Sequence, residues 1–477
     1  MNLLKALIGK QELKPYGLLD DIGLNRESLH THFYLSGETG AGKTTIIKAL
    51  LYSYLCLLER VGGLHACVKP DEASWVSDLV SQTPMKDRLI ILRLGEFRFN
   101  VASWEIFRKG GSPESFTRMM LLLNAIQQRS RGGSDGEQSF WENLFHDCMF
   151  YAASICALAY GKQVTLEHIH SFITSMPGSR EEIKSERYLK SFCCRAMMVA
   201  QDKATKPQEI RTLKAATEYV LSTQLNLGSK AKSAAVQNCL SILGPFMISP
   251  FWETFSQPDS TFTPDKPFEG FYAVMDVPVL VHGPAALLSQ AMLFKLVVEA
   301  GLRQVKPELT TLLLRDECSS VITDPFEENL WFSVARSFKL SFWSACQNIN
   351  LLTLAFGGDE TAAKGWLANH ITKFACGNTC TDTGRYFSTL YGEHKEHFHS
   401  FNERPPSEQV SDAMEAVFGN GGFTSGSSTS YHARVPIDSF LHLKRGGAPE
   451  YQVQSYMSGR ELYPDGLPYQ LVTFNQH

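Results

Sequence analysis

One glycine-rich segment combines residue types at a spacing that suits the binding of a phosphate chain. The pattern G-x4-G-K-[ST] occurs once, at Gly37, Glu38, Thr39, Gly40, Ala41, Gly42, Lys43 and Thr44, and Thr45 follows it. In such a turn the glycines let backbone N–H groups face the phosphates, the lysine reaches the β and γ phosphates, and the hydroxyl ligates Mg²⁺. We therefore predict that residues 37–45 bind ATP, with Lys43 on the phosphates and Thr44 on Mg²⁺.

An acidic pair follows an apolar run much later in the chain. Residues 310–314 lead through Arg315 into Asp316 and Glu317. A nucleotide site of this kind needs carboxylates at the end of a second strand, one for the metal and one for the attacking water. We expect Asp316 to hold Mg²⁺ through its water shell and Glu317 to polarise the water, which favours hydrolysis over binding alone. An acidic turn after a buried strand, without a catalytic role, is the alternative.

Two polar residues downstream extend this pattern. Gln347 follows the apolar run at residues 340–346 and could sense the γ-phosphate through a water molecule. Arg336 precedes the same run and could complete the nucleotide site of a neighbouring subunit as an arginine finger. Each signal is weak alone, because an isolated arginine is commonly a solvated surface residue. Their order and spacing after the acidic pair favour the catalytic interpretation.

These side chains require a parallel sheet to position them. The β-prone run at residues 32–36 precedes the glycine-rich turn, and a helical pattern at 44–60 follows it, which disfavours a turn without a nucleotide. Further β-prone runs indicate that the first hundred residues begin a parallel α/β sheet. The β-like segments lie at 63–68, 89–94, 271–275, 277–282, 310–314, 340–345, 371–375 and 451–457.

The segment between residues 112 and 255 has a helical period instead. Its predicted helices lie at 116–128, 140–160, 166–176, 181–200, 209–221 and 234–243. The glycine-rich turn and the acidic pair are about 270 residues apart, too far for one βαβ unit, so an insertion must separate them. We predict an α/β P-loop domain of residues 1–110 and 258–477, interrupted by an all-helical domain of residues 111–257.

Composition limits the class of protein. The 477 residues are 44% hydrophobic and 20% charged, which is typical of globular proteins. The net charge of −4 provides no overall basic field, so a nucleic-acid partner would need a local basic surface. Eleven cysteines without a paired framework indicate free thiols in a reducing cytosol.

No segment predicts a membrane span or a signal peptide. A span needs about 20 mostly apolar residues, and residues 148–160 stop at Gly161, so they indicate a buried helix. Residues 277–298 are interrupted by prolines and polar residues and predict a strand, a turn and a helix. Lysines interrupt the short apolar run within residues 1–14.

On these motifs the sequence resembles the type IV coupling proteins of conjugation and secretion, the TraG/TraD group, which belong with the HerA/FtsK-like DNA pumps. The resemblance rests on residues 37–45, on 312–317, and on 68–72, where the family carries Asp-Pro-Lys-Gly at a strand end. It continues through residues 335–352, 367–374 and 438–447, and so covers most of the chain.

The resemblance implies a RecA-like motor domain with an inserted all-α domain. It also implies that six copies form a ring in which ATP hydrolysis drives single-stranded or duplex DNA through a central pore, with a relaxase or secretion-channel proteins as partners. Two departures are visible. The membrane anchor usual in the family is missing, so we expect a cytoplasmic protein, or one held at the inner membrane by a partner. The Asp-Pro-Lys-Gly element is altered around Cys67 and Val68.

Two other functions stay open at this point. One is a secretion- or defence-associated motor that acts on protein or other cargo, and the other is a nucleotide-gated scaffold. His394, His397 and His399 have the density of a zinc site, but the polar stretches 393–409 and 419–430 are better interpreted as solvated loops.

Overall fold

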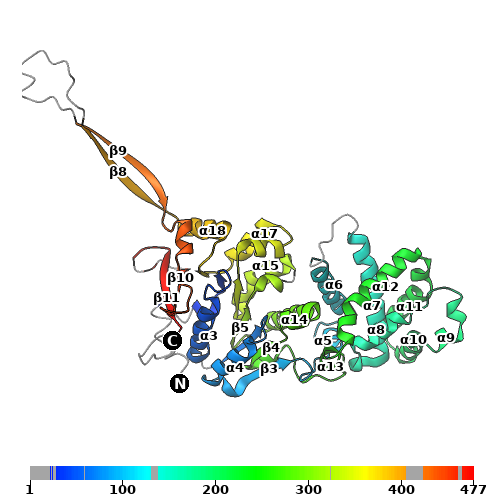
Figure 1. The fold of residues 1–477 in the computed structure, drawn as a ribbon. Helices are drawn as coiled ribbons and strands as arrows, with labels where there is room; N and C mark the ends of the chain where they lie inside the picture. Colours follow the sequence, from blue (N-terminus) through cyan, green and yellow to red (C-terminus); the bar gives the residue numbers. More distant parts are fainter. Residues whose placement is uncertain are drawn as a thin grey trace, which may run out of the picture.

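The structure is a computed structural model that describes residues 28–58, 60–129, 138–322, 324–403, 423–459 and 465–476, together with Ile22, Leu24 and Tyr463. At its centre is a nine-stranded sheet in the order β11-β10-β7-β1-β6-β5-β2-β4-β3 (Figure 1). Its strands are β1 (Phe33–Ser36), β2 (Val61–Ala66), β3 (Leu89–Arg93), β4 (Tyr272–Asp276), β5 (Thr310–Arg315), β6 (Leu340–Cys346), β7 (Thr372–Ala375), β10 (Gln452–Ser458) and β11 (Tyr469–Asn475). The predicted α/β class is confirmed.

Strands β1 to β7 pair in parallel, whereas β10 and β11 are antiparallel. The central strands β1, β2, β5, β6 and β7 are buried along their whole length. Parallel strands covered on both faces need apolar residues at successive positions, which explains why they read as continuous apolar runs. The carboxyl ends of β1, β5 and β6 consequently lie side by side at one edge of the sheet.

Successive residues of β1 enter two different cores. Phe33 and Leu35 pack with α3 (Lys43–Leu57) and α4 (Glu72–Ser81) on one face. Tyr34 packs on the other face, with a set of helices that follow later in the chain. That set comprises α14 (Val279–Leu302), α15 (Pro325–Val334), α16 (Ile349–Ala355), α17 (Glu360–Ala368) and α18 (Thr381–Tyr391).

Strand β2 passes so close to its neighbours that it requires glycine at two successive positions. A Cβ atom on Gly62 would lie 1.7 Å from the carbonyl oxygen of Pro267, and one on Gly63 would lie 2.4 Å from the Tyr272 ring. The absence of these side chains lets the backbone carry residues 64–72 toward the acidic pair on β5.

The segment between β3 and β4 is helical, as predicted. The chain leaves the sheet after β3 and returns in β4, the adjacent parallel strand, and the helices lie to one side of the sheet (Figure 1). They are α5 (Val101–Phe107), α6 (Pro113–Arg129), α7 (Gln138–Tyr160), α8 (Leu166–Thr174), α9 (Glu186–Leu189), α10 (Phe192–Lys203), α11 (Pro207–Glu218), α12 (Ser229–Leu243) and α13 (Phe251–Phe255). The apolar residues 148–160 belong to α7, much of which is buried in the core, as expected.

Two predicted elements within this order are wrong. Residues 181–200 are not one helix, because Ser185 and Ser191 each cap a new helix by accepting a hydrogen bond from a backbone N–H. Residues 277–282 are not a strand, because α14 begins at Val279, directly after Pro278. Gly283, with φ of 60°, kinks this helix after its first turn. The apolar run at 279–281 imitates a strand because the four residues between Pro278 and Gly283 are too few to show a helical period.

Helix α14 is, among the described residues, the one helix long and apolar enough to span a membrane, and 78% of its most apolar window is buried inside the protein. It packs against the sheet and against α6. Its apolar character is therefore explained by its place in the core.

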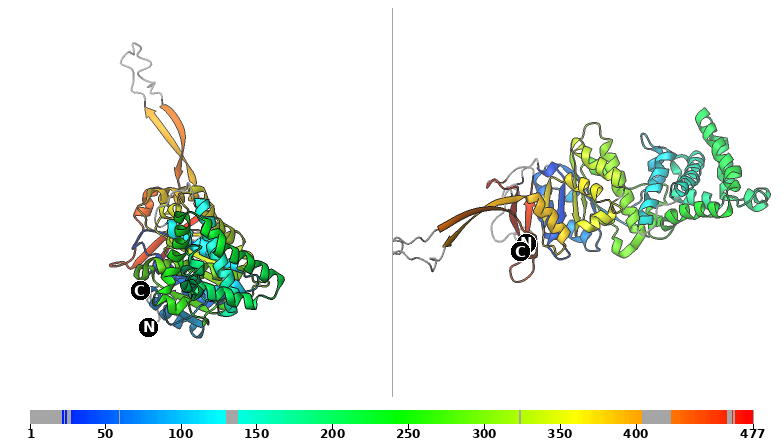
Figure 2. Two further views of the ribbon diagram at one scale, coloured as in Figure 1. Left: turned by 90° about the vertical axis from the view of Figure 1, so that its right-hand side faces the viewer. Right: turned by 90° about the horizontal axis from the view of Figure 1, so that it is seen from above.

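The stretches predicted as solvated loops form a long arm instead. Strands β8 (Glu393–Glu403) and β9 (Phe423–Ala433) pair antiparallel over their full length, and the arm extends from the opposite end of the molecule to the helical segment (Figures 1 and 2). The parts of the prediction at 404–409 and 419–422 lie outside the described residues. The described side chains of the arm are largely exposed on both faces, so the sequence contains no apolar alternation from which a strand could be recognised.

Candidate nucleotide site

The glycine-rich turn joins β1 to α3. Gly40 and Gly42 have φ of 79° and 87°, values that favour glycine, and Gly42 is the residue that precedes the first turn of α3. The Lys43 ammonium is buried inside the turn, where it donates a hydrogen bond to the Gly37 carbonyl oxygen at 2.6 Å. Thr44 follows in the first turn of α3, whose N-terminal amides and dipole favour an anion.

The acidic pair lies at the carboxyl end of β5, two strands from β1. Asp316 is 2% exposed, and its Oδ1 accepts a hydrogen bond of 3.1 Å from the backbone N–H of Glu317. Glu317 has φ of 52°, so the chain turns sharply here and brings the Glu317 carboxylate toward the glycine-rich turn. Its Oε1 is 3.8 Å from Lys43 Nζ.

Gln347 extends from the end of β6, the strand between β1 and β5. Its side-chain amide donates to Glu317 Oε1 at 3.4 Å, and its backbone carbonyl accepts from the Asn378 side chain at 2.7 Å. Lys43, Glu317 and Gln347 therefore form one connected group. Adjacent parallel strands bring together residues that are distant in the sequence.

Arg336 does not belong to this group. It is exposed in a short 3-10 helix, Ala335–Phe338, that precedes the amino end of β6, whereas the glycine-rich turn lies at the carboxyl ends of the strands. A strand of this length separates the two edges by about 20 Å. Its assignment to a neighbouring subunit's site stays a prediction.

Lys69 and Glu72, which follow β2, also belong to the site, although the sequence motifs did not predict this role. Lys69 Nζ lies 3.4 Å from Asp316 Oδ2. Glu72 is 2% exposed, and its Oε2 accepts hydrogen bonds from the backbone N–H groups of Val68 and, at 3.2 Å, Lys69. Burial, and then the charge of Asp316, raise the pKa of Glu72 to about 8. Both residues lie within residues 68–72, which carry part of the family resemblance. That resemblance was the sequence feature that could have indicated them as site residues.

Residues near the C-terminus support the glycine-rich turn. Arg445 forms an ion pair with Glu38, which also accepts a hydrogen bond of 2.9 Å from the Thr379 hydroxyl. Gln476 donates to the Thr45 hydroxyl at 3.2 Å. The Val453 side chain is so close to Gly42 that a Cβ atom there would lie 2.4 Å from it. No sequence motif indicated these contacts.

A buried ion pair fixes the end of β5 from behind. Arg315 is fully buried and donates to both carboxylate oxygens of Glu328 on α15, at 2.7 and 2.8 Å. The Trp366 indole N–H donates to the same carboxylate at 3.2 Å. Because Arg315 directly precedes Asp316, this contact sets the position from which the acidic pair turns.

The three predicted histidines of the arm do not converge. Alternation along β8 places His397 and His399 on one face and His394 on the other. His394 Nε2 contacts Glu396 at 2.8 Å, and His397 Nδ1 contacts the Thr429 hydroxyl at 3.2 Å. The arm therefore offers no joint site for these three side chains.

The donor set fits a nucleotide with Mg²⁺. The turn supplies glycines with positive φ, a buried ammonium and a helix N-terminus, and carboxylates stand opposite at the end of β5. A turn of this kind on a mostly parallel sheet defines the class of P-loop nucleotide-binding proteins.

Comparisons with known proteins show what the chain is similar to. Residues 310–436 match the sequence family described as the TraM recognition site of TraD and TraG. A comparison with curated proteins finds no match. In fold, the chain is similar to the bacterial conjugative coupling protein TrwBdeltaN70 in its unbound form, with a TM-score of 0.60 and 16% identity over 94% of this chain and 85% of that chain. It is also similar to plasmid coupling protein TrwB in complex with ADP and Mg²⁺, with a TM-score of 0.57 and 15% identity over 94% and 86%.

The resemblance to the type IV coupling proteins is thus confirmed. The fold is that of the RecA-like coupling protein TrwB, including a helical segment, and the matched family segment spans β5 to the end of the arm. The match includes Asp316, Glu317 and Gln347 but not the glycine-rich turn, so the turn is supported by its own geometry.

Proposed function

We propose that this protein is an ATP-driven DNA translocase of the coupling-protein kind. The observation that carries the proposal is the connected group Lys43, Glu317 and Gln347 at the carboxyl ends of three adjacent strands. The TrwB structure with ADP and Mg²⁺ supports ATP and Mg²⁺ as the cofactors. The motor domain comprises residues 1–110 and 258–477, and the helical domain comprises residues 111–257.

The side chains divide the work of hydrolysis. Residues 37–45 enclose the triphosphate, and Lys43 neutralises its β and γ phosphates. Thr44 and Asp316 would hold Mg²⁺, which would offset the charge that develops on the phosphates. Glu317 orients the attacking water and accepts its proton, and Gln347, which donates to the same carboxylate, registers whether the γ-phosphate is present.

The test is the variant Glu317→Gln. The amide keeps the size of the carboxylate but cannot accept the proton, so we expect ATP binding to be retained and turnover to fall at least about 100-fold. Fluorescent-nucleotide binding and phosphate release measure the two properties. Glu308→Gln, an exposed residue before β5, is the matched control and should be fully active. Normal hydrolysis by Glu317→Gln would show that another residue activates the water.

The cargo is tested separately. DNA in the pore should stimulate ATP hydrolysis, so turnover is compared without DNA, with single-stranded DNA and with duplex DNA. A motor for protein or other cargo, the alternative, would hydrolyse ATP without responding to either DNA. The family described as a TraM recognition site, matched by residues 310–436, supports relaxosome or secretion-channel proteins as partners.

Assembly is the remaining part of the proposal. Arg336 is exposed at the opposite edge of the sheet from its own site, as an arginine finger for a neighbour must be. We expect six copies to associate with ATP present, and mass measurement with and without ATP tests this. A persistently monomeric protein would favour the nucleotide-gated scaffold. Location in the cytoplasm rests on the eleven cysteines, all of which are free thiols.

A further inference from the structure

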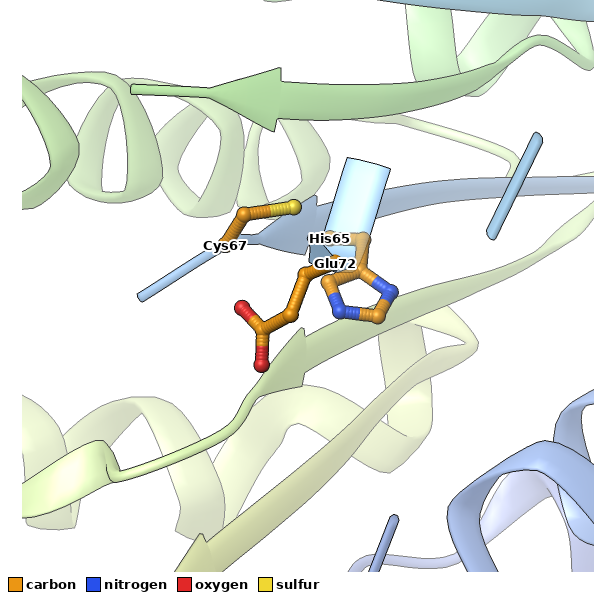
Figure 3. A group of neighbouring side chains, drawn as sticks. All are labelled: His65, Cys67 and Glu72. Carbon is orange, nitrogen blue, oxygen red and sulfur yellow. The ribbon is translucent and has the colours of Figure 1, made fainter. Parts of the chain in front are cut away.

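Three buried side chains gather at the end of β2, beside the nucleotide site (Figure 3). His65 and Cys67 are two residues apart along β2 and the turn that follows, so they extend to the same side, and Glu72 opens α4. One ring nitrogen, the sulfur and one carboxylate oxygen all lie within 4.8 Å of one another. Among the described residues, this is the one such group of metal-ligating side chains.

His65 has an unmet need for a partner. It is fully buried, and neither ring nitrogen has a hydrogen-bond partner. In its neutral form the ring carries a proton on one nitrogen and a lone pair on the other. Its neighbour on α4 is the Trp75 ring, edge to face at 5.5 Å, with which neither ring nitrogen of His65 forms a hydrogen bond. Buried polar atoms are rarely left in this state.

Glu72 is held by one oxygen and keeps the other available. Val68 and Lys69 donate their backbone N–H groups to Oε2, so Oε1 is free of these contacts. Asp316, which follows the adjacent strand β5, lies close enough for its charge to raise the pKa of the Glu72 carboxyl. Lys69 Nζ, 3.4 Å from Asp316 Oδ2, already supplies a cation to this pair of carboxyl groups. Neither that ammonium nor a proton shared by the two carboxyl groups gives the His65 ring a partner.

We propose that His65, Cys67 and Glu72 bind a divalent transition-metal ion of the zinc class. A neutral imidazole, a thiolate and a carboxylate form a mixed nitrogen, sulfur and oxygen set that suits zinc better than magnesium or calcium. A water molecule would complete the tetrahedral set as the fourth ligand. This site is separate from the Mg²⁺ position at Thr44, on the other side of the acidic pair.

The geometry requires only local movement. Tetrahedral zinc places nitrogen and sulfur ligands about 3.5 Å apart, compared with the present limit of 4.8 Å. Figure 3 shows the Glu72 carboxylate turned away from the His65 ring, so binding would rotate this side chain. The bound ion would fix the turn that carries Lys69, and with it the cation that faces Asp316.

The experiment uses the full chain purified without a histidine tag or a chelator. Elemental analysis by mass spectrometry should find close to one zinc ion per chain. After removal of the metal, titration with Co²⁺ should produce the thiolate-to-cobalt charge-transfer band. Wild-type protein that is metal-free as purified and shows no such band with Co²⁺ would overturn the proposal, whatever the variants do.

Variants assign the ligands. Cys67→Ser should lose the charge-transfer band, whereas Cys239→Ser, a fully buried thiol in the helical segment, should keep it. A band that persists in Cys67→Ser would place the ion elsewhere and also overturn the proposal. If Cys67→Ser does not fold, Glu72→Gln is measured instead and should weaken Co²⁺ binding at least tenfold. Glu317→Gln should retain the metal, so failure of this site and failure of the hydrolysis mechanism are distinguishable.

Discussion

The Lys69 ammonium and Mg²⁺ are both cations that the Asp316 carboxylate can hold. Lys69 Nζ lies 3.4 Å from Asp316 Oδ2, and although burial opposes its charge, Asp316, Glu72 and Glu317 raise the pKa of Lys69 above its ordinary value. The side chain is 42% exposed, so it can also leave this position. We infer that Lys69 competes with the metal for the carboxylate.

Replacement of Lys69 should therefore strengthen metal binding. We expect Lys69→Met to lower the Mg²⁺ concentration for half-maximal ATP hydrolysis about fivefold, which corresponds to about 1 kcal/mol for a partly exposed pair. A Mg²⁺ titration of turnover measures this, with Lys86→Met, an exposed lysine, as the control. A higher Mg²⁺ requirement in Lys69→Met would mean that the ammonium assists the metal.

At the scale of residues, the site residues that could be predicted from the sequence are those that belong to a local motif. The glycine-rich turn and the acidic pair follow fixed spacings, and Gln347 follows from its place after a strand. Lys69 and Arg445 carry no such signal, because each acquires its partner only through strand pairing or the C-terminal segment. Contacts of this kind depend on the tertiary structure.

The end of β5 depends on its buried ion pair with α15. Removal of the Arg315 side chain would leave the Glu328 carboxylate buried without its cation, and the loss of one partner of such a pair costs about 3–5 kcal/mol. We expect Arg315→Met to lower the free energy of unfolding by about this amount, as measured in urea. Arg118→Met, which removes a 75% exposed partner of Glu114, should change it by less than about 0.5 kcal/mol.

The double replacement of Arg315 by Met and Glu328 by Leu provides the internal check. It removes the unpaired charge as well as its partner, so most of the lost stability should return. A double variant no more stable than Arg315→Met would show that packing against Phe294, 4.4 Å from the guanidinium carbon, contributes more than the charge.

The close packing of β2 against its neighbours leads to a second prediction at the scale of helices and strands. A methyl group on Gly62 would lie 1.7 Å from a backbone oxygen, which cannot move as a side chain can. We expect Gly62→Ala to lower the free energy of unfolding by about 3 kcal/mol or more. Gly228→Ala, with φ of −55° and open space around the added methyl, is the control and should be close to neutral. Equal stability of the two variants would contradict the packing of β2.

The elements that sequence patterns missed share a physical cause. Apolar runs in the sequence indicate the buried parallel strands, and a helical period indicates the long helix α7. The arm of β8 and β9 is stabilised by pairing of its own backbone, and β11 has only Val472 and Phe474 buried in the core, so neither shows a strong pattern. Residues 279–282 are helical because they form the first turn of α14 after Pro278, which their apolar character alone does not indicate.

At the scale of the whole molecule, residues 37–45 and residues 445–476, far apart in the sequence, meet at the nucleotide site. Arg445 holds Glu38 of the glycine-rich turn, and the pair is partly exposed. We expect Arg445→Ala to weaken ATP binding up to about fivefold, by about 1 kcal/mol, without unfolding the protein. Lys444→Ala, which removes the adjacent pair with Glu450, should leave ATP binding unchanged. Equal affinities in both variants would show that the turn keeps its shape unaided.

The contacts of residues 445–476 with the glycine-rich turn have a consequence for the synthesis of the protein on the ribosome. The ribosome makes residues 37–45 about 400 residues before Arg445, Val453 and Gln476, which contact that turn. A nascent chain therefore contains every nucleotide motif long before its turn is completely supported. A chain that lacks residues 445–476 should bind ATP more weakly, because the turn then loses all three contacts.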